Sequence, residues 1–346
     1  MAKRSGKLIA ARAKAKRAGW VDWIRSEADE RAVLDGYYFD ARRGEHVVHF
    51  GRRFLRHTEG SAWAGKPFEL MAWQYDQLFM PLFSWVRMDP EWGRVCRRYK
   101  QAYVQVPKKN GKSPTGAFIG LYMLAGDGEH GAHVFSAATS RDQASIVHSH
   151  AIAMVEASPE LSAALRVNKT TKQITFDAKN AYYRVLSSAP RRNEGWNGNC
   201  CVADELHMWY GGELFGALRW MFASRPEPLF FMITTAGDDT ESICYQQYEY
   251  GKSLLEGGHY DPTFFPLIYE AEDEDDMGAE ATWRKANPSL GETVKVSELK
   301  QTYDQVKGAA GALGKFKQLR MNVWNAGSHA WLNRFDWMAK GRGSAA

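Results

Sequence analysis

The chain has 346 residues, 45% of them hydrophobic, so it is long enough for one large domain or for one domain with an appendage. No run of eighteen apolar residues occurs, and the basic N-terminus lacks the apolar stretch of a signal peptide. These features argue against a membrane or secreted protein and indicate a soluble, cytoplasmic one. The net charge of +5 is too small to indicate nucleic-acid binding by itself, and the four cysteines form no CxxC pair that would suggest a metal site.

The N-terminal region, residues 1 to 60, differs from the rest in charge. Seven Lys or Arg residues lie between Lys3 and Arg17, and the first 17 residues contain no acid. Such an arm either binds a phosphate backbone or is disordered, and the sequence leaves both readings open. An amphipathic helix is predicted from Trp20 to about Leu34. The following stretch, residues 36 to 60, contains several glycines and is expected to be irregular.

From Tyr99 onward, apolar runs typical of buried strands alternate with helical patterns. The predicted strands are AYVQV, AHVFSAA, NCCVA, PLFFMITTA and PTFFPLI. Continuous apolar strands separated by helices predict an α/β fold, with a mainly parallel sheet covered by helices on both faces. We expect this core to include residues 61 to 268. After the acidic run EAEDEDD, a small helical subdomain is predicted over residues 269 to 325.

The stretch VQVPKKNGKSPTGA, residues 104 to 117, is similar to a phosphate-binding loop. A predicted strand leads into a turn in which Gly111 can take a positive φ, Lys112 supplies a charge and Ser113 a Mg²⁺ ligand. The entrance differs, because Val106 stands where the motif has its first glycine. Pro114 suits the first turn of a helix but has no N–H to offer a phosphate. The loop residues predicted to contact phosphates are Lys108, Lys109, Asn110, Gly111, Lys112 and Ser113.

Two acids follow the strand NCCVA. Asp204 and Glu205 come at the carboxyl end of this strand, which in a parallel sheet is the edge that carries the phosphate loop. Asp204 is expected to hold Mg²⁺, and Glu205 to orient and deprotonate a water molecule. The alternative is that Asp204 caps a helix and Glu205 is a surface charge. Thr234 and Thr235, at the end of LFFMITT, are placed to sense the terminal phosphate of a nucleotide.

These motifs together resemble the ATPase part of tailed-phage terminase large subunits, the DNA-packaging motors, in the HK97-like group with a KNGKS loop. The resemblance extends from about Leu34 to Trp337. It rests on PFELMAWQ, VQVPKKNGKS, FSAATSRDQA, VADELH, MITTAG, WRKANPSLG, RMNVWNAG and WLNRFDW. It implies a RecA-like P-loop NTPase fold whose smaller subdomain acts as a lid, with ATP and Mg²⁺ as substrate and cofactor.

The resemblance also implies roles for single residues. Gln74 would contact adenine, Lys112 and Ser113 the phosphates and magnesium, Asp204 the metal, and Glu205 would be the catalytic base. Thr234 and Thr235 would match the motif that couples hydrolysis to motion. An arginine of a neighbouring subunit would reach the terminal phosphate in a homo-oligomeric ring. The candidates for this catalytic arginine are Arg191 and Arg192, with Arg141 third.

The implied partners are double-stranded DNA, bound through its phosphates at any sequence, a portal protein and a terminase small subunit, in the cytoplasm of a bacterial host. A complete large subunit also carries a nuclease domain. Because only Asp336 remains among the acids after Trp331, we expect no nuclease activity and interpret residues 326 to 346 as a linker. Two other functions stay open. One is a helicase-like DNA-dependent ATPase, and the other is a terminase remnant that binds nucleotide or DNA without turnover.

Overall fold

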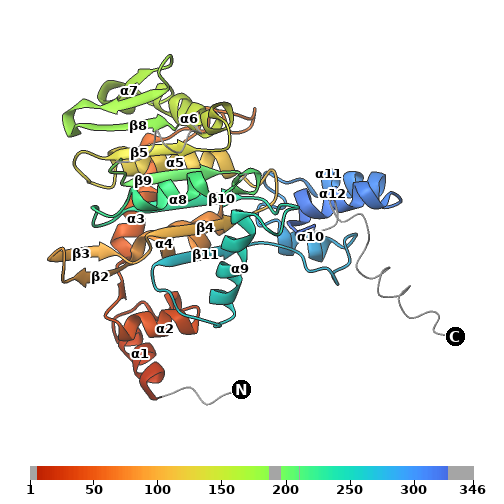
Figure 1. Cartoon of the computed structure of the whole chain (residues 1–346), viewed down its shortest axis with the longest axis horizontal. Helices are drawn as coiled ribbons and strands as arrows, with labels where there is room; N and C mark the ends of the chain where they lie inside the picture. Colours follow the sequence, from red (N-terminus) through yellow and green to blue (C-terminus); the bar gives the residue numbers. More distant parts are fainter. Residues whose placement is uncertain (1–5, 187–195, 210, 326–346) are drawn as a thin grey trace.

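The computed structural model describes residues 6 to 186, 196 to 209 and 211 to 325. Its centre is an eight-stranded sheet in the order β11-β4-β10-β9-β5-β8-β7-β6. The first six strands in this order are parallel, whereas β7 is antiparallel to both β8 and β6 (Figure 1). The strands are β4 (Gln101–Gln105), β5 (His133–Ala137), β6 (Arg166–Asn168), β7 (Gln173–Phe176), β8 (Ala181–Val185), β9 (Cys200–Asp204), β10 (Leu229–Thr234) and β11 (Phe264–Ile268).

Both faces of this sheet are buried, which explains why its strands read as continuous apolar runs. In β9, Cys200 and Val202 belong to one hydrophobic cluster, and Cys201 and Ala203 belong to another on the opposite face. The first cluster lies against α5 (Lys112–Ala125), α6 (Arg141–Glu156) and α7 (Pro159–Ala164), and the second against α8 (Glu213–Trp220) and α9 (Ile243–Leu255). The predicted α/β architecture, with helices on both faces of a mainly parallel sheet, is confirmed.

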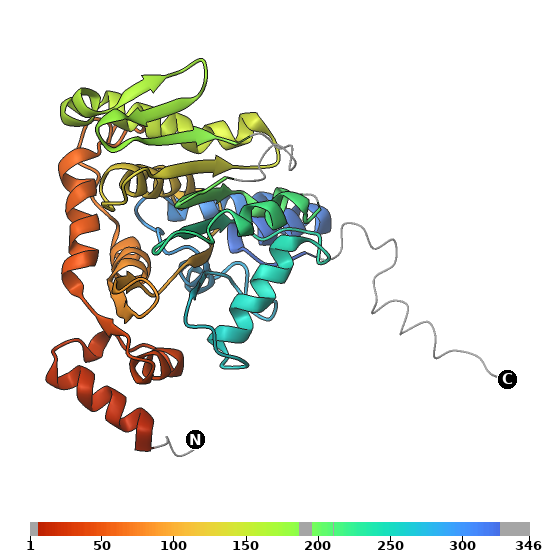
Figure 2. The ribbon, with the colours of Figure 1, turned by 60° about the vertical axis from the view of Figure 1, so that its left-hand side comes forward.

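The N-terminal region is more helical than the sequence suggested. It forms α1 (Gly6–Arg17), a short 3-10 turn (Val21–Trp23) and α2 (Glu27–Leu34). The prediction of irregular structure for residues 36 to 60 is wrong, because α3 (Ala41–Phe54) occupies much of this stretch and runs along the side of the molecule (Figure 2). Asp40 caps α3 by accepting the N–H of Arg42.

The glycines that suggested irregular structure instead allow α3 to pack closely. A Cβ added at Gly44 would lie 2.3 Å from Ser84 Oγ, and one at Gly51 would lie 2.4 Å from Phe118 Cε1. Ser84 ends α4 (Met80–Ser84), which follows a π-helical turn (Gln74–Phe79), and Phe118 lies in α5. A three-stranded antiparallel sheet lies beside α3 and α4, and consists of β1 (Tyr38–Phe39), β2 (Trp85–Asp89) and β3 (Arg94–Arg97).

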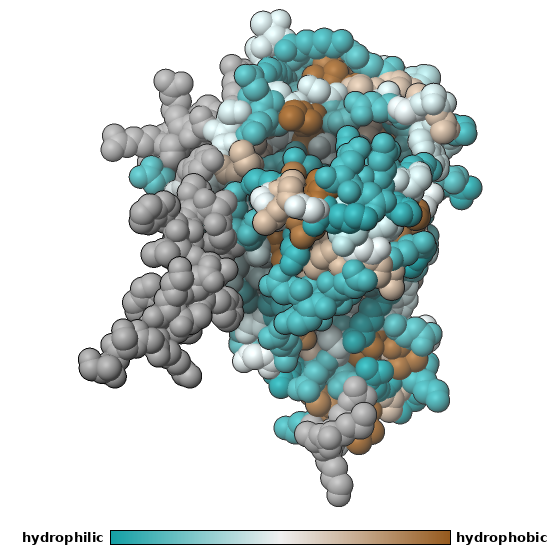
Figure 3. Space-filling view, turned by 90° about the vertical axis from the view of Figure 1, so that its right-hand side faces the viewer, coloured by the Kyte–Doolittle hydropathy of each residue, from teal (hydrophilic) through white to brown (hydrophobic). Residues whose placement is uncertain are grey.

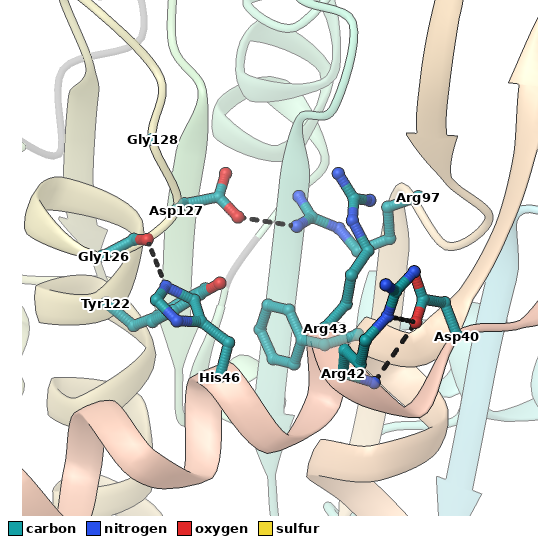
Figure 4. A pocket seen from close by; sticks show the side chains of 10 residues that line it. Asp40, Arg42, Arg43, His46, Arg97, Tyr122, Gly126, Asp127 and Gly128 are labelled. Atoms are coloured by element: carbon teal, nitrogen blue, oxygen red, sulfur yellow. Dashed lines mark hydrogen bonds and ion pairs between the residues drawn. The ribbon is translucent and has the colours of Figure 1, made fainter.

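An ion-pair cluster fastens α3 to the main sheet at the amino ends of its strands. Figure 4 shows part of this cluster, the pair of Arg97 with Asp127, beside Arg43. Arg43 Nη1 lies 2.7 Å from Glu227 Oε1, and the same oxygen accepts the backbone N–H of Arg97 at 2.7 Å. Arg97 in turn pairs with Asp127 at 3.0 Å, and Arg94 with Glu227 at 2.9 Å. Of these side chains, Arg43, Arg97 and Asp127 line a cavity of about 520 Å³. Because each of these charges has an opposite partner, the cluster is a structural clamp.

A small helical subdomain, here called the lid, follows β11. It contains α10 (Glu280–Ala286), α11 (Val296–Val306) and α12 (Ala310–Met321), which enclose their own hydrophobic cluster around Trp283 and Phe316. The side of the molecule that carries the lid is mostly hydrophilic, with hydrophobic side chains in small separate groups (Figure 3). Within the part of the chain that the structure describes, no helix is long and apolar enough to cross a bilayer.

Candidate active site

The loop between β4 and α5 has the geometry of a phosphate-binding turn. Val106 extends β4, because its N–H donates to the carbonyl of Thr234 at 3.0 Å and its side chain is fully buried in the main cluster. Gly111 has φ 78° and immediately precedes α5, as predicted. Lys109 has φ 75°, a conformation that is strained for a residue with a side chain. The first half of this loop therefore contains a residue in the left-handed conformation, Lys109, that is not a glycine. Pro114 lies in the first turn of α5, as expected.

Lys112 points back into this loop. Its Nζ donates to the carbonyls of Val106 and Pro107, both at 3.4 Å, and lies 3.8 Å from Glu205 Oε1. Burial lowers the pKa of Lys112, while the charges of Glu205 and Asp204 oppose this shift. The long contacts leave the ammonium with donors for an anion at the loop. Ser113, the next residue, is half-buried in the first turn of α5.

The two acids at the end of β9 are adjacent in sequence but differ in environment. Asp204 is buried, and its Oδ1 accepts the backbone N–H of Glu205 at 3.0 Å. Burial, with a smaller effect of the Glu205 charge, raises the pKa of Asp204 to about 7. A divalent cation would remove the cost of burying this carboxylate, so Asp204 suits a Mg²⁺ ligand, with Ser113 as the second oxygen donor that the sequence suggests.

Glu205 has φ 47°, a left-handed conformation outside the range that glutamate prefers. Burial favours its neutral form, but contacts with His207 and Lys112 outweigh burial and bring its pKa to about 2. Glu205 is therefore ionised, as a base that accepts a proton from water must be. Its Oε2 is buried without a hydrogen bond of good geometry and lies 3.2 Å from His207 Nδ1.

His207 is a residue at the site that the sequence analysis did not single out. It follows Glu205 in a 3-10 turn (Leu206–Met208), and its backbone N–H donates to Thr234 Oγ1 at 3.0 Å. Its Nδ1 lies 3.1 Å from Thr234 Oγ1 and 3.3 Å from Thr235 Oγ1. The structure thus connects the predicted base with the two predicted coupling threonines, both of which are fully buried. His207 follows the two acids in the sequence DELH, and this proximity was the only sign of its place in the site. A single histidine matches no known spacing of ligand or catalytic residues.

Gln74 lies beside the loop, and its side chain is buried and does not face solvent. Only 2% of it is exposed; its Oε1 accepts the N–H of Met71 at 3.0 Å and its Nε2 donates to Thr115 Oγ1 at 2.9 Å. A cavity of about 290 Å³ opens next to it. The cavity is lined from three sides by the chain before Gln74, by Gly111 and Pro114 of the loop region, and by Glu292 and Thr293 of the lid. The adenine-contacting role of Gln74 stays a prediction.

The lid reaches the loop through the motif ANPSLG. Asn110 is fully buried; its Nδ2 donates to Asn287 Oδ1 at 3.0 Å, and its Oδ1 accepts the N–H of Ser289 at 3.1 Å. Asn322 of the motif MNVW accepts the N–H of Ala236, directly after Thr235, at 2.7 Å. The lid is therefore hydrogen-bonded both to the phosphate loop and to the end of β10.

The remaining predicted residues lie at the rim or outside the described part. The side chains of Lys108 and Lys109 are exposed, and their backbone groups bond to the lid, at Leu319 and Thr293 respectively. Arg191 and Arg192, and the linker over residues 326 to 346, lie outside the described residues, and so does the side chain of Arg141.

Comparison with known families identifies two matching domains. The ATPase domain of the terminase large subunit matches residues 79–253, and the endonuclease domain of the same protein matches residues 259–340. The second match runs against the expectation that no nuclease sequence follows the ATPase part, and that expectation is not confirmed. The described portion of this match forms β11 and the lid, and within it and the other described residues no group of three or more His, Cys, Asp or Glu is placed to hold a metal.

Individual relatives agree with the first match. The chain is 24% identical over 299 residues to the terminase large subunit of Enterobacteria phage HK97, which covers 85% of this chain and 56% of that protein. It is 28% identical over 155 residues to protein YmfN of Escherichia coli (strain K12), covering 45% of this chain and 34% of that protein. The matched part of this chain thus covers just over half of the length of the first relative and about a third of the second.

The fold is also similar to a solved structure. The crystal structure of the HK97 bacteriophage large terminase superimposes with a TM-score of 0.69 at 22% identity, over 82% of this chain and 55% of that one. Because the ATPase-domain match includes just over half of the chain, the chain belongs to the family of terminase large subunits.

Proposed function

We propose that this chain binds and hydrolyses ATP with Mg²⁺, and that hydrolysis drives double-stranded DNA into a phage procapsid. The observation that carries the first part is the meeting of Lys112 and Glu205, 3.8 Å apart, at the carboxyl edge of a parallel sheet. A cation on a phosphate-type turn and an ionised acid at the end of a neighbouring strand are the two groups that phosphoryl transfer to water requires. Family membership supports the second part.

In this proposal each polar group has one task. The N-terminus of α5 and Lys112 hold the phosphates, and Ser113 with Asp204 would hold Mg²⁺, which supplies charge neutralisation. Glu205 accepts the proton of the attacking water, since contacts with His207 and Lys112 keep its carboxylate ionised. Thr234, Thr235 and the lid are candidates to couple the state of the site to motion.

The cavity beside Gln74 is the proposed site for the base. It adjoins Gly111 and is lined largely by Trp63, Phe68, Leu70 and Met71, an apolar surface suited to the face of a purine. With both ends of its amide bonded inside the protein, Gln74 would have to exchange a bond to Thr115 or Met71 for one to adenine. Glu292 and Thr293 would bring the lid against the base from the other side.

We assign nucleotide hydrolysis, rather than DNA cleavage, to the described residues. Residues 259 to 325 of the endonuclease match supply an edge strand of the ATPase sheet and the lid. The portal protein, the small subunit and a ring of identical subunits are the proposed partners, with an arginine such as Arg191 or Arg192 acting on the neighbouring subunit. Contact with DNA would be through phosphates, so its affinity should fall steeply with salt.

The first test is Mg²⁺-dependent ATP hydrolysis at high protein concentration, with and without double-stranded DNA. Turnover that Lys112→Ala and Glu205→Gln both abolish would establish the ATPase.

The double variant Arg191→Ala with Arg192→Ala, measured in crosslinked assemblies, tests the proposed catalytic arginine. ATP binding that depends on Lys112 without any turnover in such assemblies would favour a remnant that only binds nucleotide. Incubation of the same protein with plasmid DNA and Mn²⁺ measures cleavage directly.

A further inference from the structure

The ring nitrogen Nδ1 of His207 lies near polar side chains at the carboxyl ends of two neighbouring strands, β9 and β10. Nδ1 lies 3.2 Å from Glu205 Oε2, after β9, and 3.1 Å from Thr234 Oγ1, at the end of β10. The His207 side chain is only 9% exposed, so these groups are its main polar surroundings on this side. The backbone N–H of the same residue also donates to Thr234 Oγ1. His207 is therefore fixed to β10 by its backbone while its ring reaches Glu205.

The neighbours of Nδ1 determine where the imidazole proton lies. The hydroxyl of Thr234 donates to the carbonyl of Thr235 at 2.9 Å, so toward Nδ1 it can only accept. The carboxylate of Glu205 is also only an acceptor. With the carboxylate of Glu205 at 3.2 Å and the Thr234 hydroxyl donating elsewhere, the contacts favour the tautomer in which Nδ1 carries a hydrogen. Thr235 Oγ1, at 3.3 Å, can take the same hydrogen as a weaker third acceptor.

Glu205 needs such a donor. Its backbone is held in a left-handed conformation, and its Oε2 is buried. Among the described residues, the ion-pair partner of its Oε1 is the ammonium of Lys112, 3.8 Å away. A glutamate side chain has three rotatable bonds, and a base works only when its oxygen is held within hydrogen-bond reach of the water. A second anchor on Oε2 fixes the direction of the carboxylate and leaves Oε1 toward Lys112.

We propose that His207 is a positioning residue for hydrolysis, which holds Glu205 through Nδ1–H and joins that carboxylate to Thr234 at the end of β10. The proposal rests on the proposed ATPase activity. Because one hydrogen serves both acceptors, a shift of Thr234 relative to Glu205 changes the direction of the carboxylate. His207 is thus the contact through which the coupling threonines act on the base.

The test compares His207→Ala with His207→Asn, because an asparagine amide places an N–H close to the position of Nδ1. We expect His207→Ala to lower kcat by roughly 10- to 100-fold, part of the contribution of a general base, with little change in KM for ATP. His207→Asn should retain kcat within a few-fold. Thermal melting of both variants shows whether they fold. A His207→Ala protein that folds and keeps the wild-type kcat would overturn the proposal.

A double-mutant cycle separates positioning from a merely structural role. In a Glu205→Gln background, His207→Ala should lower the residual kcat no further, since its effect passes through Glu205. An equal loss in both backgrounds would contradict the proposal while leaving the ATPase itself intact.

NMR of histidine-labelled protein gives a measurement that needs no turnover. The His207 signals, assigned by their loss in His207→Asn, should show the Nδ1–H tautomer and should move in Glu205→Gln. An Nε2–H tautomer with an unprotonated Nδ1 would overturn the proposal even if the chain does not hydrolyse ATP. Lys112-independent turnover, by contrast, would count against the proposed function alone.

Discussion

Buried charges lie at both ends of the parallel strands of the main sheet. Those at the amino ends of the strands are arranged differently from those at the carboxyl ends. At the amino ends of the strands, Glu227 lies within 2.9 Å of Arg43 and Arg94. At the carboxyl ends of the strands, Lys112 and Glu205 are 3.8 Å apart, and Asp204 forms no ion pair with any of the described residues. Charges in short ion pairs hold neighbouring elements together. Charges without a close counter-ion can still bind a charged ligand. The difference indicates which buried ions serve stability and which serve chemistry.

The largest expected effect is on turnover at the carboxyl ends of the strands. Glu205→Gln removes the proposed proton acceptor and should lower kcat by about 10² to 10⁴-fold, while ATP binding persists. Steady-state hydrolysis and a separate nucleotide-binding titration measure the two quantities. A variant that retains more than a tenth of the wild-type kcat would mean that another group takes the proton from water.

The matching change at the amino ends of the strands should affect stability instead. Glu227→Gln leaves Arg43 and Arg94 without their shared anion. Because both arginines are partly exposed, the expected cost is about 3 kcal/mol of unfolding free energy, the low end for a broken buried pair. Urea unfolding measures the loss, and kcat per folded molecule should stay near wild type. If kcat falls and the unfolding free energy does not, the clamp has been assigned the wrong role.

Asp204→Asn should stabilise the protein, in a way that depends on pH. The folded-state pKa of Asp204, about 7, lies above the ordinary 3.8, so its contribution is complete below pH 3.8 and is lost as pH rises toward 7. Asparagine does not ionise and avoids that loss. The variant should gain roughly 2 to 4 kcal/mol over wild type at pH 8, and less at pH 5.5, without Mg²⁺.

Urea unfolding in EDTA at the two pH values tests this, and the variant should also lose Mg²⁺-dependent hydrolysis. A difference in stability that is the same at pH 5.5 and pH 8 would show that Asp204 is not the group that titrates.

A smaller effect is expected where the lid meets the loop. Asn110→Ala leaves Asn287 Oδ1 and the N–H of Ser289 buried without their partner, which costs about 1 to 3 kcal/mol. Thr293→Ala is the control, because it removes an exposed hydrogen bond to Lys109 at the same junction and should cost less than about 1 kcal/mol. Equal losses in thermal unfolding would indicate that the buried asparagine pair is not what holds the lid.

The sheet and the loop could be predicted from sequence because their signals are local. The apolar runs of β4, β9 and β10 and the turn before Lys112 each specify their own structure. The helix α3 was missed because Gly44 and Gly51 act through Ser84 and Phe118, which are distant in sequence. A packing glycine and a turn glycine look the same until the neighbouring element is known.

The sequence predicted which residues form the site better than it predicted how these residues contact one another. Asp204, Glu205 and Lys112 follow from motif order, but the approach of His207 to Glu205 depends on the left-handed backbone at Glu205, which no propensity favours. Likewise, Asn110 and Asn287 are separated by most of the ATPase sequence, and only the folded chain brings them together.

The position of β11 has a consequence for how such proteins are divided into fragments. This strand pairs with β4, the strand that leads into the phosphate loop, yet it lies within the segment matched by the endonuclease domain. A fragment cut at residue 253, where the ATPase match ends, would expose β4 as an open sheet edge and would lack the lid. In this chain the border between two sequence families therefore falls inside one sheet, and recombination at that border would separate β11 and the lid from the strands on which they pack.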